Sequence, residues 1–562
     1  MTIRVTITKP GVTNGYGLPL AVGTTYTVEE PLGFSLISQG KASDADGITT
    51  NPVLKNQPYE TARVAIYAPA PSGGDDTAAL QAVMNRASAA YSEAVGRIKL
   101  VFQAGEYSVT GLVICPNVWY DFGDAIFVKS NDGTGAAFGT VCSPTHAVLR
   151  TQELLVGSTY YGNYDNIKIT GGTFDMQDKV CNAAGVCLLN LRHARIYGMQ
   201  VIRSGTTACW STLIGGQDIE IHDLRTSGGT VAGQDGLHIG QGQDIRVFGG
   251  YYESGDDAIA IGMDDLGALF DDEAIERVSI VNPAVNSIYA YGLKVYYRAP
   301  ASGSNRHKVR GVRVTNLMGR SGQANNGGIG FYDHSGVDLV DVTRIKDVHV
   351  TCDLEVGSAS HVGTVASGIL VQTASDWSIS GRIKIIDTTG GATRFIAGQI
   401  DASLRGKVDV HFPLVPANGG IYVRNLSTSV HQLFDTEICG TFVYNSSSTI
   451  AGVVLQSAVR TTVKANFIDI PASVSGIRAN APTVSGVQST LTAIDCKFVE
   501  ASGATTTVGI NSAAASRLLH ANVVGCDFAG VDSAVDASFT TNVATYCFAG
   551  NRSLANAQDV TP

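Results

Sequence analysis

Long apolar runs are missing from this chain of 562 residues, and no segment is apolar enough to span a membrane. The sequence therefore predicts no membrane insertion. The first residues, MTIRVTITKPG, lack the apolar core of a secretory signal. Charged residues make up only 16% of the chain, and the net charge of −10 argues against a general nucleic-acid-binding role.

Paired cysteine motifs are missing as well. The ten cysteines form no disulfide framework, so we expect free, mostly buried thiols in a chain that folds in a reducing cytoplasm. If such a protein acts outside the cell, it must leave by another route, such as cell lysis. The histidines and cysteines lack metal-ligand spacing, and residues 264–273 are acidic without the ligand spacing of a calcium loop. We expect that segment to be a solvated insertion rather than a cation site, and we expect no cofactor and no metal.

Glycine is plentiful, with 64 residues that punctuate short alternations of valine, isoleucine and leucine. This composition is typical of a β-rich chain with many tight turns. Between residues 233 and 262 one phrase occurs twice, as Asp235-GLHIG and, 22 residues later, as Asp257-AIAIG. An internal repeat with alternating apolar residues is typical of a β-solenoid, whose coils stack on each other.

The repeat continues almost to the end of the chain. One strand of each coil is marked by segments such as QDIEIHDLRTS and QDIRVFGGYYES, and the next strand by a small residue before alternating apolar residues. The small residues are Gly185, Gly236, Ala258, Gly292, Gly328, Gly368, Gly420, Gly452, Gly476 and Gly509. Because one strand phrase recurs in the same order so often, a parallel β-helix explains the pattern better than a β-sandwich.

The N-terminal region predicts two features outside the repeat. Residues 1–60 form a small module and a proline-rich linker, unless they are a disordered leader. Residues 71–95 predict a helix that Asp75 or Asp76 caps. Its apolar positions at helical spacing are Ala79, Leu80, Val83, Met84 and Ala87. We expect this helix to cover the open first coil of the solenoid.

The rest of the chain divides by composition. Residues 61–400 form the β-helix domain, and His, Tyr, Arg and Asp are concentrated in its coils, so chemistry is expected between 190 and 340. Residues 401–562 are rich in Ser, Thr, Ala, Val and Gly. They are expected to be structural, either a continuation of the solenoid or a trimerisation region.

Three aspartates are the candidate catalytic groups. Asp235 and Asp257 should be neighbours on adjacent coils, since stacked parallel strands lie about 4.8 Å apart, and Asp256 is one position back. Crowded carboxylates repel one another, which raises the pKa of at least one of them. Glycoside hydrolysis needs such a proton donor together with a carboxylate that activates water or attacks directly. The alternative is a ladder of turn residues, the role expected of Asp218 and Asp244.

Aligning the coils places four candidate substrate-binding residues near these aspartates. Tyr291 falls in the row of Asp235 and Asp257, while His238 and Lys294 share a row two positions past Ala258 and should point outward. Trp210, on the preceding coil, could stack on a sugar ring. The alternative for each is an ordinary surface or packing residue.

Two sets of motifs resemble known proteins. Residues 74–81, GDDTAALQ, and 102–107, FQAGEY, resemble the opening of pectin-lyase-like right-handed β-helices, which occur in bacteriophage tailspikes and glycoside hydrolases. Gln234-Asp235-Gly236 and Gly255-Asp256-Asp257 resemble two motifs of the polygalacturonase family. The resemblance implies an all-β, right-handed, single-stranded parallel β-helix. It also implies that Asp256 is the general acid, with Asp235 and Asp257 positioning water for an inverting attack.

Two departures from the polygalacturonase pattern bear on the substrate. The family's Gly-His-Gly motif should fall at Tyr291-Gly292, and its Arg-x-Lys pair should fall near Gly330 and Tyr332, yet the basic residues of both are absent. Because those residues bind a uronate carboxylate in the family, a pectin substrate is not expected.

The resemblance to tailspikes implies a virion protein of the phage tail, a homotrimer assembled in the bacterial cytoplasm. Residues 36–42, LISQGKA, are similar to attachment modules of phage tail proteins, which implies that the N-terminus binds the tail or baseplate. The implied partner is a bacterial surface polysaccharide, the O-antigen of lipopolysaccharide or a capsule. Two other functions stay open: a lyase that uses Tyr291, His238 or Lys294 on a uronate-containing glycan, and a non-catalytic adhesin.

Overall fold

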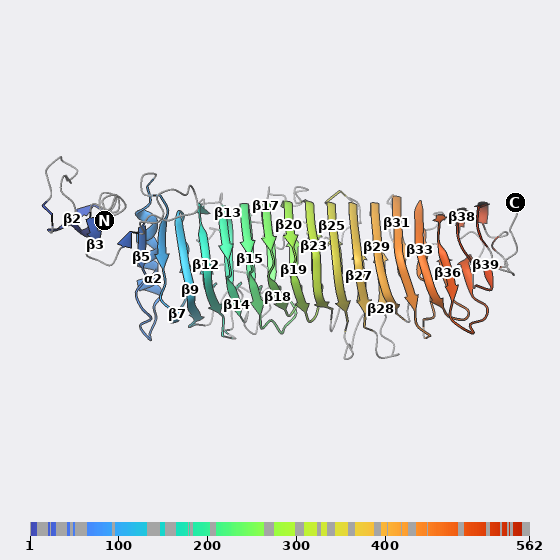
Figure 1. Ribbon diagram of the computed structural model, residues 1–562, viewed down its shortest axis with the longest axis horizontal. Helices are drawn as coiled ribbons and strands as arrows, with labels where there is room; N and C mark the ends of the chain where they lie inside the picture. The colour runs from blue at the N-terminus through green and yellow to red at the C-terminus, as the bar shows by residue number, and fades with distance from the viewer. Residues whose placement is uncertain are drawn as a thin grey trace. The chain divides into compact units, whose positions relative to one another are not determined.

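A computed structural model gives the fold of the chain (Figure 1). It describes 2–7, 21–22, 24–29, 42–44, 49–50 and then 64–552 with these gaps: 93–95, 132–146, 152–163, 178, 180–183, 203–209, 263–274, 298–307, 323–326, 334–342, 358–365, 387–394, 402, 417–418, 425–433, 447, 481–487, 513–517, 529–530, 537–538 and 540–542.

The chain forms two compact units. The N-terminal unit comprises Met1–Gly229 and Gly242–Gly250, and the C-terminal unit comprises Thr230–Gln241 and Tyr251–Pro562. The strand β17 (Leu237–Phe248) therefore contributes residues to each.

Parallel strands build the N-terminal unit from residue 64 onward. They are β5 (Val64–Tyr67), β6 (Ile98–Val101), β7 (Gly105–Val109), β8 (Leu112–Val113), β9 (Val118–Lys129), β10 (Leu149–Arg150), β11 (Tyr164–Asp165), β12 (Lys168–Asp175), β13 (Val186–Tyr197), β14 (Gln200–Ile202), β15 (Thr212–His222) and β16 (Arg225–Ser227). Before them, β1 (Thr2–Ile7), β2 (Thr25–Glu29) and β3 (Ala42–Asp44) form a small antiparallel sheet, and β4 (Thr49–Thr50) pairs with β5 in antiparallel fashion.

The C-terminal unit repeats the same arrangement. Its strands are β18 (Tyr251–Ser254), β19 (Ile259–Gly262), β20 (Ile275–Val281), β21 (Ala284–Ser287), β22 (Leu293–Tyr297), β23 (Val309–Ser321), β24 (Ile329–Asp333), β25 (Ile345–Val356), β26 (Ala366–Val371), β27 (Ala374–Ile385), β28 (Phe395–Ile400), β29 (Ser403–Val415), β30 (Ile421–Arg424), β31 (Phe434–Tyr444), β32 (Val453–Gln456), β33 (Thr461–Ile470), β34 (Ser475–Ala479), β35 (Ser489–Ile494), β36 (Lys497–Glu500), β37 (Val508–Asn511), β38 (Leu518–Val524), β39 (Ser533–Val535) and β40 (Val543–Ala549).

The expected fold, an all-β, right-handed, single-stranded parallel β-helix, is confirmed (Figure 1). In each unit a strand pairs with the equivalent strand of the next coil, as β13 does with β15 and β22 does with β24. Alternation along each strand directs valine, isoleucine and leucine into the coil, where they are almost fully buried. The phrases that begin with a small residue, from Gly236 to Gly509, coincide with one stack of strands, because the small residue lets neighbouring coils approach closely at the bend.

A bend in the backbone, before or within a strand, repeats as well. In the N-terminal unit Asn117, Asn166, His193, Asp218 and Asp244 all have φ between 50° and 63°, one on each coil. Asn and Asp tolerate this left-handed backbone better than other residues with side chains. Asp218 and Asp244 therefore share one left-handed bend position, and the Asp218 carboxylate pairs there with Arg195 and Arg246.

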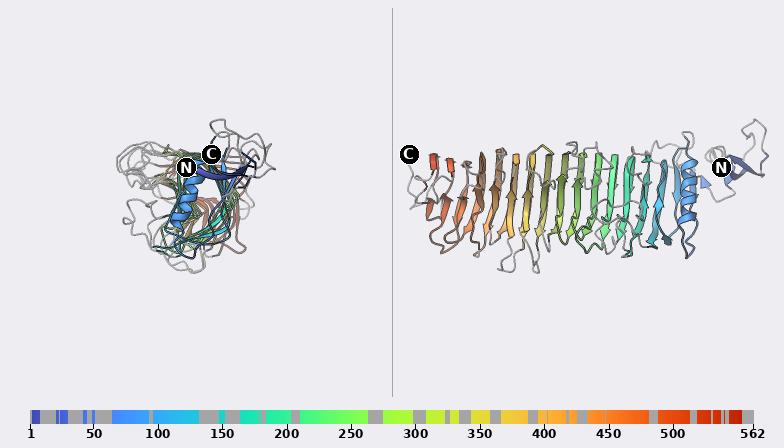
Figure 2. Two further views of the ribbon diagram at one scale, coloured as in Figure 1. Left: turned by 90° about the vertical axis from the view of Figure 1, so that its left-hand side faces the viewer. Right: turned by 180° about the vertical axis from the view of Figure 1, so that it is seen from behind.

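The helix α2 (Thr77–Ala89) lies at the end of the first coils of the N-terminal unit (Figure 2). It buries Leu80, Met84 and Ala87. The Gln81 side chain donates a hydrogen bond to the Val113 carbonyl (2.9 Å) and accepts one from the Val113 N–H (2.8 Å). The helix thus covers the apolar end of the solenoid and satisfies backbone groups at the edge of β8.

Two expectations about this helix need correction, and a third is met. It is shorter than the predicted 71–95, because the glycine-containing turn before Asp75 and the single-residue bridge of Ser92 with Gly96 flank it. Ala79 is exposed, since the packed stripe is narrower than the apolar spacing suggested. The expectation that Asp75 or Asp76 caps the helix is met by Asp75, whose carboxylate accepts from the Thr77 N–H (3.0 Å) at the first helical residue. The Asp76 carboxylate accepts from the Ser72 N–H (2.9 Å).

Beyond residue 400 the coils continue with the same parallel pairing to β40. A column of stacked phenylalanines, with ring centroids 4.9–5.4 Å apart, runs through this part: Phe412, Phe442, Phe467, Phe498 and Phe528. This column packs successive coils in register. The domain boundaries at residues 60 and 400 remain predictions.

The cysteines that the structure describes are free thiols, and five of the seven are buried, as expected. No helix among the described residues is long and apolar enough to cross a membrane. The acidic segment 264–273 lies outside the described residues.

Candidate active site

The three aspartates meet on adjacent coils of the C-terminal unit. Leu237 of β17 pairs with Ile259 of β19, so Asp235 and Asp257, each two positions earlier, lie in one row. Asp256 precedes Asp257 in the bend between β18 and β19. One carboxylate oxygen from each of the three lies within 4.8 Å of the others. The predicted cluster is therefore present as a geometric feature.

Backbone groups fix the orientation of each carboxylate. The Asp257 N–H donates to Asp235 Oδ1 (3.3 Å), and the Tyr291 N–H on the next coil donates to Asp257 Oδ1 (3.0 Å). Asp256 Oδ2 accepts from the Gly233 N–H at 2.8 Å. Because these donors belong to the stacked coils themselves, the cluster is preorganised by the fold.

Sequence reasoning missed three residues that support the cluster. Buried Gln234 accepts two backbone N–H bonds through Oε1, from Thr230 (2.7 Å) and Val231 (2.9 Å), which shapes the turn before Asp235. Ser254 and Ser287, paired on adjacent coils, both donate to the Asp256 carbonyl. The recurrence of serine at the end of these two strand phrases was the available signal.

His238 lies beside Asp235, in the row predicted for it. Its Nδ1 is 2.8 Å from Asp235 Oδ2, and its Nε2 is 3.0 Å from the Gly262 carbonyl oxygen and 3.2 Å from the Tyr296 hydroxyl. The side chain points away from the apolar interior yet is 0% exposed. The expectation of a substrate-binding histidine is therefore not supported, since the ring is enclosed and its hydrogen bonds orient Asp235 instead.

Lys294 lies in the same row as His238, because Ala260 pairs with it across β19 and β22. Its Nζ is 2.9 Å from Asp257 Oδ2 and 5.1 Å from the centroid of the Tyr296 ring, and the side chain is 16% exposed. Burial opposes the charged form of Lys294, but Asp257, Asp235 and Asp256 outweigh it and raise the pKa of the ammonium group. Lys294 is thus a charged partner of Asp257.

The surroundings of the cluster raise the pKa of Asp256 and of Asp257. Burial, followed by repulsion from Asp257 and Asp235, raises the pKa of Asp256 to about 8. Burial also raises the pKa of Asp257, while Lys294 opposes that shift. Near neutral pH, Asp256 is therefore the carboxyl group that holds a proton.

Tyr291 occupies the row of Asp235 and Asp257, where the polygalacturonase pattern has histidine. Its side chain is buried, and a Cβ added at Gly330 would lie only 2.8 Å from the ring. Gly330 therefore makes room for the tyrosine ring at the place where the family pattern has a basic residue. Tyrosine in place of the family's histidine and glycine in place of its basic residue therefore belong together, because the Tyr291 ring packs over Gly330. The buried Tyr291 ring acts in packing rather than in ligand contact.

Trp210 belongs to the N-terminal unit, next to β15, and only 5% of it is exposed. A ring with so little exposed surface has no face to offer a sugar. The predicted stacking role is therefore not supported.

Among the residues that the structure describes, the carboxylates of Asp235, Asp256 and Asp257 form a group whose oxygen atoms could hold a cation. Oxygen ligands suit a hard cation. The Lys294 ammonium group already lies 2.9 Å from Asp257 Oδ2, so a metal ion there would meet a fixed positive charge. The donor set therefore fits a salt bridge better than a metal.

Comparisons with known proteins add the following. No protein-family model and no curated protein matches the chain. Solved structures do match. A double mutant of the tailspike protein of E. coli bacteriophage HK620 is 11% identical, with a TM-score of 0.43, and the match covers 86% of this chain and 76% of the tailspike. PfbA, a surface adhesin of Streptococcus pneumoniae, is 11% identical, with a TM-score of 0.37 and coverage of 80% and 91%. A hyperthermoactive exopolygalacturonase from Thermotoga maritima is 10% identical, with a TM-score of 0.32 and coverage of 62% and 90%. None of the three assigns a function to this chain.

The arrangement can perform acid–base chemistry with two kinds of carboxyl group. Asp256 can donate a proton. The Lys294 ammonium group beside Asp257 stabilises the ionised form of that carboxyl group, which opposes the effect of its burial. Burial raises the pKa of Tyr291, and that of Lys294 is also raised, so neither group is a ready base near neutral pH.

Proposed function

We propose that the C-terminal unit carries a glycoside hydrolase site. The observation that supports it is a proton-holding carboxyl, Asp256, within 4.8 Å of a carboxylate that a lysine neutralises. Enzymes place titratable groups in environments that separate their pKa values when one must act as acid and the other as base. The motifs around Asp235 and Asp256, which resemble those of polygalacturonases, agree with these roles.

The proposed reaction divides the work among the three aspartates. Asp256 gives its proton to the glycosidic oxygen as the bond from that oxygen to the anomeric carbon breaks. Asp235 and Asp257 hold one water molecule and take its proton as its oxygen bonds to that carbon. Lys294 and His238 do not touch the sugar; they position Asp257 and Asp235.

The proposed substrate is a bacterial surface polysaccharide, either an O-antigen or a capsule. The family's uronate-binding positions are filled by the packing of Tyr291 on Gly330, which argues against pectin. The resemblance of residues 74–107 to tailspike openings supports a phage tailspike. In that setting the protein is a homotrimer in the virion, assembled in the host cytoplasm and attached to the tail through residues 1–60.

The decisive variant is Asp256→Asn. We expect it to abolish the release of reducing ends from a susceptible polysaccharide while leaving binding intact, and Asp235→Asn and Asp257→Asn to lower the rate by about 100- to 10,000-fold. The matched control is Asp353→Asn, an exposed residue of the same unit that pairs with Arg382 at 2.9 Å. Unchanged turnover by Asp256→Asn contradicts the assignment of the acid.

Polysaccharides from a panel of bacterial strains separate the remaining functions. Shortened chains with new reducing ends and no absorbance near 235 nm indicate hydrolysis, whereas that absorbance indicates the double bond of a lyase product. Binding without loss of chain length on every polymer that binds indicates an adhesin and overturns the hydrolase proposal.

Stereochemistry needs its own measurement. The resemblance implies inversion, yet inverting enzymes usually separate their carboxyl groups by about 6.5–9.5 Å, and the nearest oxygens here are within 4.8 Å. In an inverting reaction the water must therefore bind beside Asp235 and Asp257 rather than between them and the acid. Proton NMR of the first anomer released tests this: a product that retains the substrate's configuration contradicts it.

A further inference from the structure

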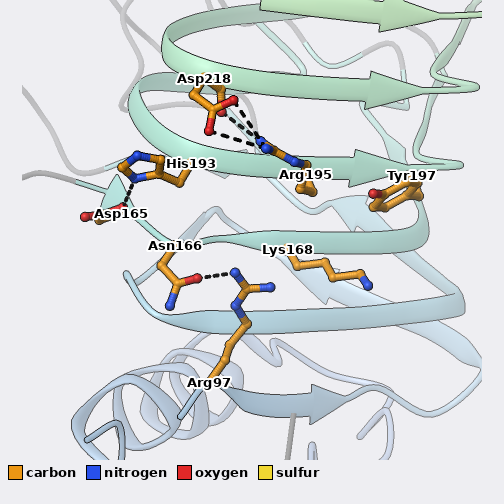
Figure 3. A pocket seen from close by; sticks show the side chains of 8 residues that line it. All are labelled: Arg97, Asp165, Asn166, Lys168, His193, Arg195, Tyr197 and Asp218. Carbon is orange, nitrogen blue, oxygen red and sulfur yellow. Dashed lines mark hydrogen bonds and ion pairs between the residues drawn. The ribbon is translucent and has the colours of Figure 1, made fainter. Parts of the chain in front are cut away.

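The N-terminal unit contains a pocket of about 500 Å³ that the hydrolase proposal does not use (Figure 3). Its lining comes from successive coils, from Arg97 just before β6 to Asp218 in β15. The volume is within the range of about 300–1,000 Å³ typical of ligand sites, and far above the roughly 30 Å³ that a water molecule occupies.

Strand register brings the lining residues together. Lys168 of β12 pairs with Arg195 of β13, and two positions on, Thr170 pairs with Tyr197. Ile169 and Ile196, between these positions, are buried in the coil, so Lys168, Arg195 and Tyr197 lie on the outer face. Figure 3 shows their side chains projecting from neighbouring strands over one hollow.

The three cations of the pocket are held in place. Arg195 Nη2 lies 3.2 Å from Asp218 Oδ1, and Arg97 donates a hydrogen bond to the side-chain oxygen of Asn166 (Figure 3). Lys168 Nζ lies 4.2 Å from the ring centroid of Trp119 and 5.5 Å from that of Tyr197. A site whose charged groups are already positioned loses less conformational entropy when a ligand binds.

The charge of the pocket is positive although the chain as a whole carries −10. Arg97, Lys168 and Arg195 face two carboxylates, Asp165 and Asp218. Two charges outside the lining offset each other: Arg246 pairs with Asp218 at 3.2 Å, and Glu220 pairs with Arg195 at 3.3 Å. His193 Nδ1 lies 2.8 Å from Asp165 Oδ1. The pocket therefore favours an anionic ligand.

Other features of the lining suit a sugar rather than a bare anion. Asn166 supplies an amide with donor and acceptor atoms, and the volume exceeds the need of a small ion. The Tyr197 ring stacks on His222 (4.8 Å between centroids) and so forms a fixed wall of the pocket. Guanidinium groups bind carboxylates through paired hydrogen bonds. We propose that this pocket is a second, non-catalytic binding site for a sugar residue that carries a carboxylate.

This site anchors a polysaccharide by its acidic residues, and it does not depend on hydrolysis at the aspartates. The test is ligand-observed NMR titration of the full chain with D-glucuronate against D-glucose and with D-galacturonate against D-galactose. Each pair differs at the sixth carbon, where a carboxylate replaces a hydroxymethyl group. We expect at least one uronate to bind at least about tenfold more tightly than its neutral partner, as expected for one charge-assisted contact, and to weaken with salt.

Variants locate the site. Lys168→Met keeps the apolar stem and removes the charge, and Arg97→Gln removes a guanidinium; each should weaken uronate binding by about tenfold. Arg382→Gln is the matched control, because Arg382 is an exposed arginine that pairs with Asp353 and does not line the pocket. Thermal melting shows whether each variant folds. Asp256→Asn should bind the uronate like the unmodified protein, which separates this proposal from the hydrolase proposal.

Three results overturn the proposal: neither uronate binds more tightly than its neutral partner, both folded variants bind like the control, or inorganic phosphate competes as well as the uronate does. If neither variant folds, the comparison of uronates with neutral sugars and its salt dependence in the unmodified protein decide the question.

Discussion

The alkaline side of the pH profile tests the role of Asp256 most directly. Burial and the neighbouring carboxylates Asp257 and Asp235 raise the pKa of Asp256 to about 8. At that value about nine in ten Asp256 side chains carry a proton at pH 7 and about one in ten at pH 9. A general acid acts only in its protonated form, so kcat/KM should fall about tenfold for each pH unit above 8.

The assay measures reducing-end release at low substrate concentration from pH 5 to pH 10, with polysaccharide binding measured at each pH. Binding should stay constant while turnover falls. Because the pKa of Asp257 is raised too, the acidic limb should lie above the ordinary aspartate value of about 3.9. The reasoning is refuted if kcat/KM stays constant up to pH 9.5, or if the alkaline fall begins below pH 6. Asp353→Asn should reproduce the unmodified profile.

Three other changes probe the same structure. Lys294→Met removes the cation that lowers the pKa of Asp256 and of Asp257, so both limbs of the profile should move to higher pH, whereas Lys384→Met, which removes a more exposed cation, should leave them in place. Folding raises the pKa of Asp256, so the folded state holds an extra proton between about pH 4 and pH 8 and stability declines as pH rises through that window. Asp256→Asn removes this penalty. The melting temperature of the variant minus that of the unmodified protein should therefore be larger at pH 9 than at pH 4, and a difference that does not change with pH contradicts the raised pKa. Gly440→Ala should cost more than about 1 kcal/mol in denaturant unfolding, because its φ is +107° and the new Cβ would lie 2.1 Å from a carbonyl oxygen; Gly503→Ala, at φ +77° in open space, should cost less.

The repeat in the sequence predicted the rows of the site because each coil of a solenoid places equivalent residues one above another. Asp235, Asp257 and Tyr291 lie in one row, and His238 and Lys294 in another, as the phrase alignment indicated. Pairing between parallel strands fixes register, and register fixes which side of the strand a residue faces. The spacing of the repeated phrases was therefore enough to predict both the β-helix and the carboxylate cluster.

The burial of individual side chains could not be predicted from spacing. Alternation correctly directed His238 away from the interior, but it could not show that the ring is enclosed and bonded to Asp235. Likewise, the absence of a basic residue at Gly330 gave no sign that the Tyr291 ring fills the space. These features depend on contacts between coils, and a one-dimensional pattern does not specify which side chain fills a gap on the next coil.

The positively charged pocket lined by Arg97, Lys168 and Arg195 could not be predicted from the sequence for a related reason. Arg97 and Asn166 are 69 residues apart and belong to no shared phrase, yet they form a hydrogen bond. The repeated bend explains the contact, because Asn166 occupies the left-handed position that repeats on each coil. The left-handed positions that bend the backbone also place their side chains along one line of the outer face. Asn166 is therefore both a bend residue and part of the pocket lining.

The contact between Lys294 and Asp257 accounts for the division of roles among the aspartates. Burial raises the pKa of both Asp256 and Asp257, so the donor and the base must be distinguished by other interactions. Lys294 Nζ lies 2.9 Å from Asp257 Oδ2, so its charge favours ionisation of that carboxyl group most directly. The negative charge kept on Asp257 then helps to hold the proton on Asp256. One lysine on the neighbouring coil thus turns a repulsive cluster into an acid and a base.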